Sequence, residues 1–254
     1  MAPHTRETTA LVFGCLDHGE SDKIITIFSR DLGRVTGIAK GANRSKKRFQ
    51  NKLELFSHVT LSYNERPHST LIFIADAELH DSFMKLRRSV DCYIAATLIR
   101  ETLLMAVTDR EGDEGVFALL LWSLQAMDND QEPLGVTAIF LLRFFDRIGY
   151  RPDLTHCRSC EKPFIPGDAF SFQHMTGGLV CSDCCEREGG GCSELSSGTI
   201  RLLATVLDEP LERLHRLKFS RQALRQALAM LHRYGRNLFQ RDIQSWKALR
   251  PMLQ

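Results

Sequence analysis

The sequence predicts an α+β protein: a small five-stranded β-barrel, then an all-helical domain into which a four-cysteine element is inserted. Three observations predict this class. Short apolar segments separated by turn residues fill the first 80 residues, helical spacing of apolar residues follows, and six of the eight cysteines lie within 36 residues. We expect the barrel over residues 1–80, the first helices over 81–150, the cysteine-rich insertion over 151–194, and helices that complete the helical domain over 195–254.

The barrel is predicted from five segments rich in apolar and β-branched residues, bounded by turn residues such as Asp31-Leu32-Gly33. The segments cover residues 9–16, 23–28, 34–40, 55–63 and 70–77. Short strands with turn residues between them are typical of small barrels and sandwiches. About 80 residues with one long connection favour the OB-fold, a barrel that binds oligonucleotides. An SH3-like barrel produces nearly the same pattern, and the pattern does not separate the two.

Helices are predicted where apolar residues recur three or four positions apart, beginning with Phe83, Leu86 and Val90. The predicted helices cover residues 81–105, 115–127, 134–148, 199–207 and 220–239. Pro133 suits the first turn of the third helix, and Ser196 or Ser197 suits the N-cap of the fourth. Residues 151–194 lack helical periodicity, and 169–173 with 179–180 indicate a small hairpin.

Composition excludes several protein classes. The 254 residues are 43% hydrophobic and 25% charged, as in globular proteins and unlike collagenous or disordered chains. The longest strictly apolar run, residues 116–122, has seven residues, whereas a membrane span needs about 20. Residues 1–9 are too polar for a signal peptide. The sequence therefore predicts a cytoplasmic protein without a membrane partner.

The cysteine spacing predicts one structural zinc ion. Cys157-x2-Cys160 is followed, after 20 residues, by Cys181-x2-Cys184. In a reducing compartment such a cluster binds a metal more often than it forms disulfides. Two tight turns bring four thiolates to one tetrahedral ion, and a site with four thiolates leaves no open position for catalysis. Alternatives remain: Cys185 in place of Cys184, His156 or His174 as a substitute ligand, or free core thiols.

Sequence motifs of common enzyme classes are absent. The chain has no P-loop, no dinucleotide fingerprint after a strand, no His-Glu-x-x-His and no Gly-x-Ser-x-Gly. We therefore expect a protein that is not an enzyme.

A basic segment between the third and fourth predicted strands is the main candidate for nucleic-acid binding. It holds six cations and no acid within thirteen residues, and Arg30 and Arg34 extend the predicted track. A single strand is bound by a positively charged groove with faces on which bases stack. Phe49 and Phe56 lie nearby but also suit the core. The predicted DNA-binding residues are Arg30, Arg34, Lys40, Arg44, Lys46, Lys47, Arg48 and Lys52.

A second basic region lies near the C-terminus. Residues 195–254 carry a net charge of +7, whereas residues 81–194 carry −7. The cations are Arg213, Arg216, Lys218, Arg221, Arg225, Arg233, Arg236 and Arg241. Such a face binds phosphates or an acidic partner, or it balances the acidic middle region within the fold. The sequence leaves these alternatives open.

Three stretches resemble the RecO recombination-mediator family. The first runs from Leu11 through His18-Gly19-Glu20-Ser21-Asp22-Lys23 to Thr26-Ile27-Phe28-Ser29, Gly33-Arg34 and Ala39-Lys40-Gly41-Ala42. The second runs from Phe140 and Arg143 through Ile148-Gly149-Tyr150 to Pro152 and Leu154. The third is the four-cysteine element. The last 60 residues match only in helical character.

The resemblance implies an OB-fold DNA-binding domain followed by a helical domain with a zinc-binding insertion. It also implies a non-enzymatic function in DNA repair. Such proteins bind single- and double-stranded DNA, anneal complementary strands and bind the acidic C-terminal tail of single-strand-binding protein (SSB). With RecR, and often with RecF, they help load RecA onto SSB-coated strands in the cytoplasm, at the nucleoid.

The resemblance also suggests individual roles. The basic face of the family is matched in kind and place by Arg34, Lys40, Arg44, Lys46, Lys47 and Arg48. Arg143 resembles an arginine of the SSB-tail pocket. An acidic and aromatic tail needs a cation beside an apolar wall, which Phe140 and Phe144 would supply, although both phenylalanines also suit the core.

Two other functions remain as hypotheses from the residues alone. One is a zinc-stabilised adaptor that binds only proteins, with the basic segment incidental. The other is an OB-fold protein that binds RNA. Salt-insensitive or absent DNA binding would favour the adaptor, and competition between RNA and DNA of one sequence would identify the RNA-binding protein.

Overall fold

The computed structural model describes residues 5–65, 69–187 and 191–254. The chain divides into two compact units, each described here by itself. The first unit comprises Met1–Met84 and Val107–Leu124, and the second comprises Lys85–Ala106 and Gln125–Gln254. This division groups residues by contact, and the four-part domain organisation expected from the sequence stays a prediction.

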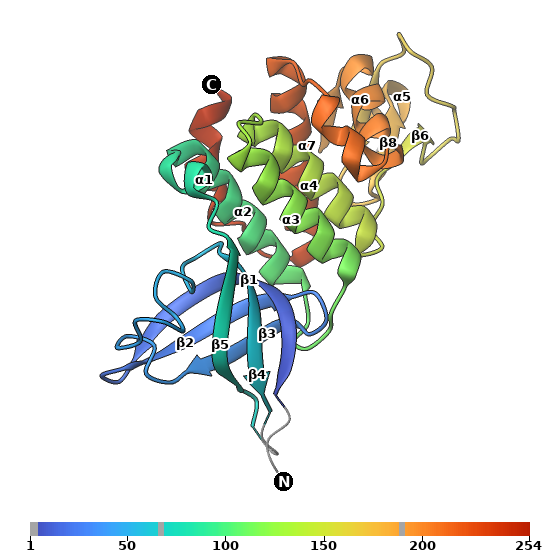
Figure 1. The fold of residues 1–254 in the computed structure, drawn as a ribbon. Coiled ribbons are helices and arrows are strands. Elements are labelled where there is room, and N and C mark those ends of the chain that lie inside the picture. The colour runs from blue at the N-terminus through green and yellow to red at the C-terminus, as the bar shows by residue number, and fades with distance from the viewer. Residues whose placement is uncertain (1–4, 66–68, 188–190) are drawn as a thin grey trace. The chain divides into compact units, whose positions relative to one another are not determined.

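The first unit contains the predicted barrel (Figure 1). Its strands are β1 (Arg6–His18), β2 (Asp22–Ser29), β3 (Gly33–Ala39), β4 (His58–Asn64) and β5 (Ile72–Asp81). They form a closed barrel in the order β1-β2-β3-β5-β4, and β4 pairs back onto β1. β3 and β5 are parallel, whereas the other neighbours are antiparallel. The predicted class, an OB-like barrel followed by helices with a four-cysteine element, is confirmed.

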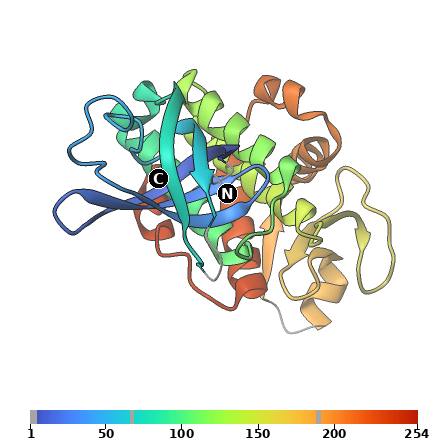
Figure 2. The same ribbon diagram turned by 60° about the horizontal axis from the view of Figure 1, so that its bottom comes forward.

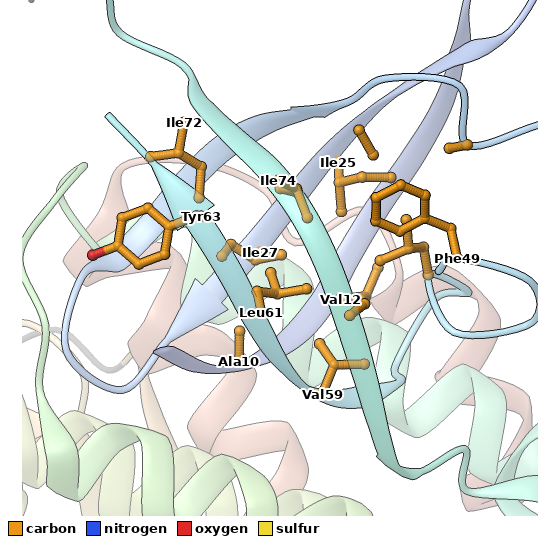
Figure 3. Packing of buried hydrophobic residues seen from close by; sticks show 14 of the residues in the cluster. Ala10, Val12, Ile25, Ile27, Phe49, Val59, Leu61, Tyr63, Ile72 and Ile74 are labelled. Atoms are coloured by element: carbon orange, nitrogen blue, oxygen red, sulfur yellow. The ribbon is translucent and has the colours of Figure 1, made fainter. Parts of the chain in front are cut away.

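Alternating apolar residues fill the interior of the barrel. In β3 every second residue is buried, which gives Gly33, Val35, Gly37 and Ala39 an inward position. Figure 3 shows side chains from the surrounding strands meeting inside the barrel. A Cβ on Gly37 would lie 2.8 Å from Ile72, so glycine allows the close β3–β5 pairing.

One predicted strand begins later than expected. The pattern predicted a strand from residue 55, but β4 begins at His58. Phe56 has a left-handed φ of 68°, and its N–H donates to the carbonyl of Val12 at 2.7 Å. Because this turn buries Phe56 in the interior, apolar character at residues 55–57 reflects a packed turn and not a strand.

Helices begin after the barrel strands. They are α1 (Met84–Arg88), α2 (Val90–Ala106), α3 (Glu114–Asp128), α4 (Pro133–Arg147), α5 (Ser182–Arg187), α6 (Ser197–Asp208), α7 (Arg221–Phe239) and α8 (Trp246–Leu249). Short 3-10 helices cover Leu211–Arg216 and Arg250–Leu253. Most residues of α4 are buried. This helix contacts α2, α6 and α7 and forms the centre of the second unit. Across the described residues, none of these helices combines the length and apolar character needed to cross a membrane.

Side chains fix several helix boundaries. The single helix predicted over residues 81–105 is interrupted, because the Ser89 hydroxyl accepts the N–H of Cys92 and starts α2. Ser196 caps α6, which resolves the choice between Ser196 and Ser197. Glu132 caps α4 with Pro133 in its first turn, as expected for this proline. Ser220 caps α7 in the same way.

The cysteine-rich segment forms a four-stranded sheet in the order β6-β8-β7-β9. The strands are β6 (Asp153–Cys157), β7 (Phe170–Gln173), β8 (Gly178–Cys181) and β9 (Cys192–Leu195). β7 and β8 form the predicted hairpin, whereas β6 and β9 have no alternating pattern that would reveal them. β9 contacts α7, so the sheet is attached to the helical unit.

Candidate nucleic-acid interface and metal centre

The basic segment forms the connection between β3 and β4. Three apolar residues fix it to the barrel, since Ala42, Phe49 and Leu53 are 6%, 4% and 2% exposed and belong to the barrel core. Figure 3 shows Phe49 inserted beside Ile25. Phe49 is therefore a core residue and offers no open face on which a base can stack. Anchoring leaves the polar residues between these positions at the surface.

The turn between β1 and β2 holds the start of this loop. The Asp22 carboxylate accepts the N–H of Gly41 at 2.8 Å, which lowers the pKa of Asp22. The N–H of Asn43 donates to the carbonyl of Ser21 at 2.9 Å. Gly41 has φ of +68°, a conformation that favours glycine. Figure 2 shows the loop, in mid-blue, at the same end of the barrel as this turn.

Four loop cations project into solvent: Lys40, Arg44, Lys46 and Lys47 are all exposed. Arg44 contacts Glu20 at 3.2 Å, but both side chains are highly exposed, so this pair contributes little to stability. Among the described residues, Lys46 and Lys47 have no ion-pair or hydrogen-bond partner. Lys46 and Lys47 are therefore available to phosphate groups without breaking a contact of the fold.

Arg48 and Lys52 are bonded to the barrel. The Arg48 guanidinium donates to the carbonyls of Ala75 and Lys40 at 3.2 and 3.3 Å and lies 4.9 Å from the centre of the Phe49 ring. Lys52 Nζ donates to the carbonyl of Ala77 at 2.6 Å. These two cations hold the loop in place while adding to its positive charge.

The loop borders a hollow of about 600 Å³. Its wall comes from the loop and β2, and cations contribute more of it than acids do. The lining residues are Lys23, Ala42, Asn43, Arg44, Ser45, Lys46, Phe49, Gln50, Asn51, Leu53 and Glu54. A concave, polar and cationic surface of this kind suits a phosphate chain.

Arg30 and Arg34 lie apart from the loop cations. They flank the turn before β3, whereas the loop leaves the other end of that strand. A seven-residue strand is about 23 Å long. Arg30 contacts Asp31 at 3.3 Å, and Arg34 is paired with Asp109. The structure therefore does not join them to the loop in one cluster, and their contact with DNA stays a prediction.

The four predicted zinc ligands come together at one edge of the small sheet. β6 and β8 are parallel neighbours, so their carboxyl ends, with Cys157 and Cys181, lie side by side. Cys160 follows in the turn after β6, and Cys184 lies in the first turn of α5. Each Cys-x2-Cys turn thus directs its two thiols toward the same point, where the four sulfur atoms meet.

The geometry of this cluster fits a tetrahedral metal ion. The four sulfur atoms lie within 4.8 Å of one another, and those of Cys160 and Cys181 are 3.8 Å apart. Sulfur atoms bound at 2.3 Å to one tetrahedral zinc ion are separated by about 3.8 Å. The four cysteines could therefore hold a metal ion, and thiolates are donors that zinc prefers.

Ionisation of the cluster needs a compensating charge. Burial opposes the charged form of Cys157, but N–H groups of Cys181, Cys160 and Ser159 outweigh it and lower the pKa to about 6. Burial and neighbouring sulfur atoms raise the pKa of Cys184 to about 12, although Arg187 donates to its sulfur at 2.8 Å. The thiolate of Cys157 therefore forms readily, whereas a bound cation would be needed for all four cysteines to be thiolates at once.

The alternative ligands have other partners. Cys185 is bonded to Cys192 in a disulfide, which the sequence reading did not anticipate. His156 lies 3.3 Å from Asp153. His174 Nε2 forms a hydrogen bond with the Ser193 hydroxyl at 3.0 Å, and burial lowers the pKa of His174 to about 4. The metal-binding group in the described part of the chain consists of the four cysteines.

The residues suggested for the SSB tail have structural contacts. Phe140 and Phe144 are fully buried and stack on each other at 5.4 Å. Arg143 donates to the carbonyl of Leu207 at 2.6 Å and to that of Glu209, which satisfies acceptors at the end of α6. These side chains thus form no open apolar wall, and tail binding at this place stays a prediction.

Arg187 is a site residue that sequence reasoning missed. It follows Cys184 by three positions, which places both side chains on one face of α5. The helix itself was not expected within the aperiodic cysteine-rich segment. The three-residue spacing from Cys184 to Arg187, which is typical of one helix face, was the signal that would have found it.

Comparison with known families matches the barrel and the helical part of the chain separately. A family described as "Recombination protein O N terminal" matches residues 1–83, and one described as "Recombination protein O C terminal" matches residues 87–247. The chain belongs to the RecO family. The first match covers the barrel, and the second covers the helices and the four-cysteine element.

Curated RecO relatives match nearly the whole chain. A DNA repair protein RecO from Syntrophobacter fumaroxidans is 33% identical over 245 residues, which cover 96% of this chain and 97% of the relative. DNA repair protein RecO from Syntrophus aciditrophicus is 28% identical over 247 residues, with 96% and 95% covered. That from Syntrophotalea carbinolica is 29% identical over 245 residues, with 96% and 94% covered.

Proposed function

We propose that this RecO-family protein is a non-enzymatic recombination mediator in DNA repair. It binds single- and double-stranded DNA, anneals complementary strands, and binds SSB. With RecR, and with RecF, it helps load RecA onto SSB-coated strands in the cytoplasm, at the nucleoid. Membership in the RecO family and the names of its relatives support this proposal.

The observation that carries the proposal is the exposed, unpaired charge of Lys46 and Lys47 on an anchored loop. Each phosphate that a cation neutralises releases condensed counterions, which drives binding at low salt. Lys40, Arg44, Lys46 and Lys47 contact phosphates, whereas Arg48 and Lys52 keep the loop on the barrel. Because Phe49 is buried, binding at this loop depends on charge more than on base stacking.

Annealing follows from the same electrostatics. Two complementary strands repel each other as polyanions, and a cationic surface reduces that repulsion. No covalent step is required, so the proposed activity needs no nucleotide or catalytic metal. A closed site with four thiolates agrees with this proposal, because zinc held there stabilises the fold and has no open position for a substrate.

SSB is the proposed protein partner. Binding of its acidic tail at Arg143, Phe140 and Phe144 requires a local rearrangement, because both phenylalanines are buried and the arginine bonds two carbonyl groups. RecR, RecF and RecA are proposed on family membership alone.

The proposed function is tested by annealing two complementary oligonucleotides, each coated with SSB, without ATP. We expect fast annealing that requires the SSB tail and weakens with salt. The variant Lys46→Glu/Lys47→Glu should reduce the slope of log K against log salt by about 1.4, since each lost single-strand phosphate contact contributes about 0.7. Arg88→Glu/Arg201→Glu, which reverses two exposed cations elsewhere, serves as the control.

Three outcomes would contradict the proposal. Absence of DNA binding even at low salt would favour the protein-binding adaptor. Tighter binding of RNA than of DNA of the same sequence would favour an RNA-binding protein. An unchanged salt slope in the loop variant would exclude the loop from the binding surface.

A further inference from the structure

The exposed face of α7 carries arginine and glutamine only. Its exposed residues are Arg221, Gln222, Arg225, Arg233, Arg236 and Gln240, the last of these at the C-cap, and the exposed Arg241 follows. The sequence has no aspartate or glutamate from residue 221 to residue 241. A helix whose opposite face is buried by leucine and alanine thus presents cations near both of its ends. Over the 15 residue steps from Arg221 to Arg236 this face extends about 22 Å.

A hollow of about 490 Å³ lies at the C-terminal end of this face. Its lining is entirely polar, with three arginines and a single carboxylate. The lining residues are Arg233, Arg236, Asn237, Gln240, Arg241 and Asp242. The hollow therefore carries a net formal charge of +2.

Residues of the small sheet hold two of these side chains. Arg233 donates to the hydroxyl of Ser193 at 3.3 Å, and that hydroxyl forms a hydrogen bond with His174 Nε2 at 3.0 Å. Asn237 Nδ2 donates to the carbonyl of His174 at 3.0 Å. Ser193 and His174 are each 7% exposed, so the partners of Arg233 are fixed within the fold. Arg233 is thereby positioned before any ligand binds.

The remaining cations differ in their contacts with other residues of the fold. Arg236 forms an ion pair with Asp242 at 2.7 Å, with both side chains about half exposed. Arg225 and Arg241 have no ion-pair or hydrogen-bond partner within the described ranges. Arg221 donates to the carbonyl of Gln254. The charges of Arg225 and Arg241 thus have no acidic partner among the described residues and are available to an external anion.

We infer that the α7 face, comprising Arg221, Arg225, Arg233, Arg236 and Arg241, binds the phosphate groups of a nucleic-acid strand. This site consists of other residues than the barrel loop. The inference rests on the proposed function in one respect, the choice of DNA as the polyanion. Guanidinium groups bind phosphate oxygens through paired N–H donors. An arginine row of about 22 Å spans several phosphates, which are about 3.4 Å apart along one strand of B-DNA.

The chemistry of the hollow favours phosphates over an acidic peptide. A tail that combines carboxylates with aromatic residues needs an apolar wall, and among the described residues only polar ones line this hollow. A phosphate chain needs hydrogen-bond donors alone, which the arginines, Asn237 and Gln240 provide. A second strand site gives one chain a way to hold both strands during annealing.

The experiment uses the full-length protein and fluorescence anisotropy of a labelled single-stranded 30-mer at low salt. The starting variant is Lys46→Glu/Lys47→Glu, in which two positive charges of the barrel loop are reversed. Adding Arg225→Glu/Arg241→Glu should weaken the residual binding at least tenfold. Adding the control pair Arg88→Glu/Arg201→Glu should change it less than twofold. All substituted residues are exposed, and thermal melting checks that each variant folds.

The α7 pair is also introduced into the otherwise unchanged protein. We expect annealing to fall at least tenfold, while binding of one strand at the loop falls much less. Equal binding by the α7 and control variants overturns the inference and leaves the loop proposal intact. If wild type and every variant fail to bind DNA, the proposed function itself fails. Loss of binding to an SSB-tail peptide, with DNA binding unchanged, overturns the inference in favour of an acidic-peptide site.

Discussion

Arg48 shows that cations of one loop have different physical roles. Its guanidinium bonds two backbone carbonyls and lies over Phe49, whereas Lys47 next to it has no partner among the described residues. Charge alone therefore does not identify a DNA contact. The contacts of each side chain with its own fold separate the cations that stabilise the loop from those available to a ligand.

The variant Arg48→Ala should lower the free energy of unfolding by about 1–2 kcal/mol, because two carbonyl hydrogen bonds and a cation–π contact are lost. Lys47→Ala should change the free energy of unfolding by less than about 0.5 kcal/mol while weakening DNA binding. Urea denaturation measures both. Equal stability of the two variants would contradict the positioning role of Arg48.

Arg143 has a comparable role in the second unit. Arg143→Ala should destabilise the protein by about 1–3 kcal/mol, because the carbonyls of Leu207 and Glu209 lose a charged donor. Annealing of naked DNA should stay unchanged. Binding of a labelled SSB-tail peptide, compared with Arg201→Ala, decides whether Arg143 also contacts the tail. A variant as stable as wild type would exclude the structural role.

Protonation of His174 should make stability depend on pH. Burial, with Arg233 nearby, lowers the pKa of His174 to about 4, whereas an unfolded histidine titrates near 6.5. The unfolded state therefore binds more protons in this window, so stability is complete above pH 6.5 and is lost as the pH falls toward 4. The loss is on the order of 2 kcal/mol.

The variant His174→Gln should have a flatter profile of unfolding free energy between pH 6.5 and 4. Some slope should persist, because burial also lowers the pKa of His232 to about 4. His215→Gln, at an exposed position, is the control and should keep the wild-type profile. A wild-type slope in the His174 variant would mean that other groups cause the acid sensitivity.

At the scale of elements, we expect the four-cysteine sheet to depend on a bound ion for its stability. Its strands are only four or five residues long. Cys157→Ser/Cys160→Ser should abolish stoichiometric metal binding and lower the melting temperature by at least 10 °C. Metal analysis and thermal melting measure these effects.

Cys15→Ser provides the matched control, because Cys15 is a free, partly exposed thiol of the barrel. It should keep both the metal content and the melting temperature. A stable double variant without metal would contradict a structural role for the site.

Elements with a clear period could be predicted from the sequence. The alternation in β3 and the apolar spacing of α4 and α6 each gave the correct type of structure. The errors arose where a single contact decided the outcome, as when Ser89 interrupted the first helix and Phe56 turned inward before β4. β6, β9 and α5 were missed because short elements around a metal cluster need no periodic pattern.

Candidate site residues were predictable to different degrees. The cysteine spacing identified the members of the cluster, because ligand chemistry restricts both residue type and separation. The sequence placed Arg34 and the basic segment at opposite ends of the third predicted strand, but it did not decide between tail contact and the core for Phe140 and Phe144. This choice depends on contacts between residues distant in the chain.

At the scale of the whole molecule, local charge matters more than net charge. The chain carries only +2 and has an isoelectric point of about 8.1, yet two cationic surfaces have few acids nearby. Lysine and arginine side chains keep their charge to about pH 10 and above. A surface made of them should therefore bind phosphates even where the chain as a whole is negative.

DNA binding should accordingly persist at pH 9, with an affinity within about threefold of that at pH 7 and constant ionic strength. Anisotropy titrations at the two pH values measure this. The Lys46→Glu/Lys47→Glu variant should bind weakly at both. A steep loss of wild-type binding across the isoelectric point would show that net charge governs the interaction.

The anchoring of the β3–β4 loop has a consequence for design. Ala42, Phe49 and Leu53 hold the loop to the barrel, so residues 43–47 form a short surface cassette between fixed points. A closed barrel has no free strand edge through which a change in this cassette would disturb the pairing. Residues 43–47 should therefore accept replacement by segments of other charge or length. Variants made in this way would share one barrel and bind nucleic acid with graded affinity.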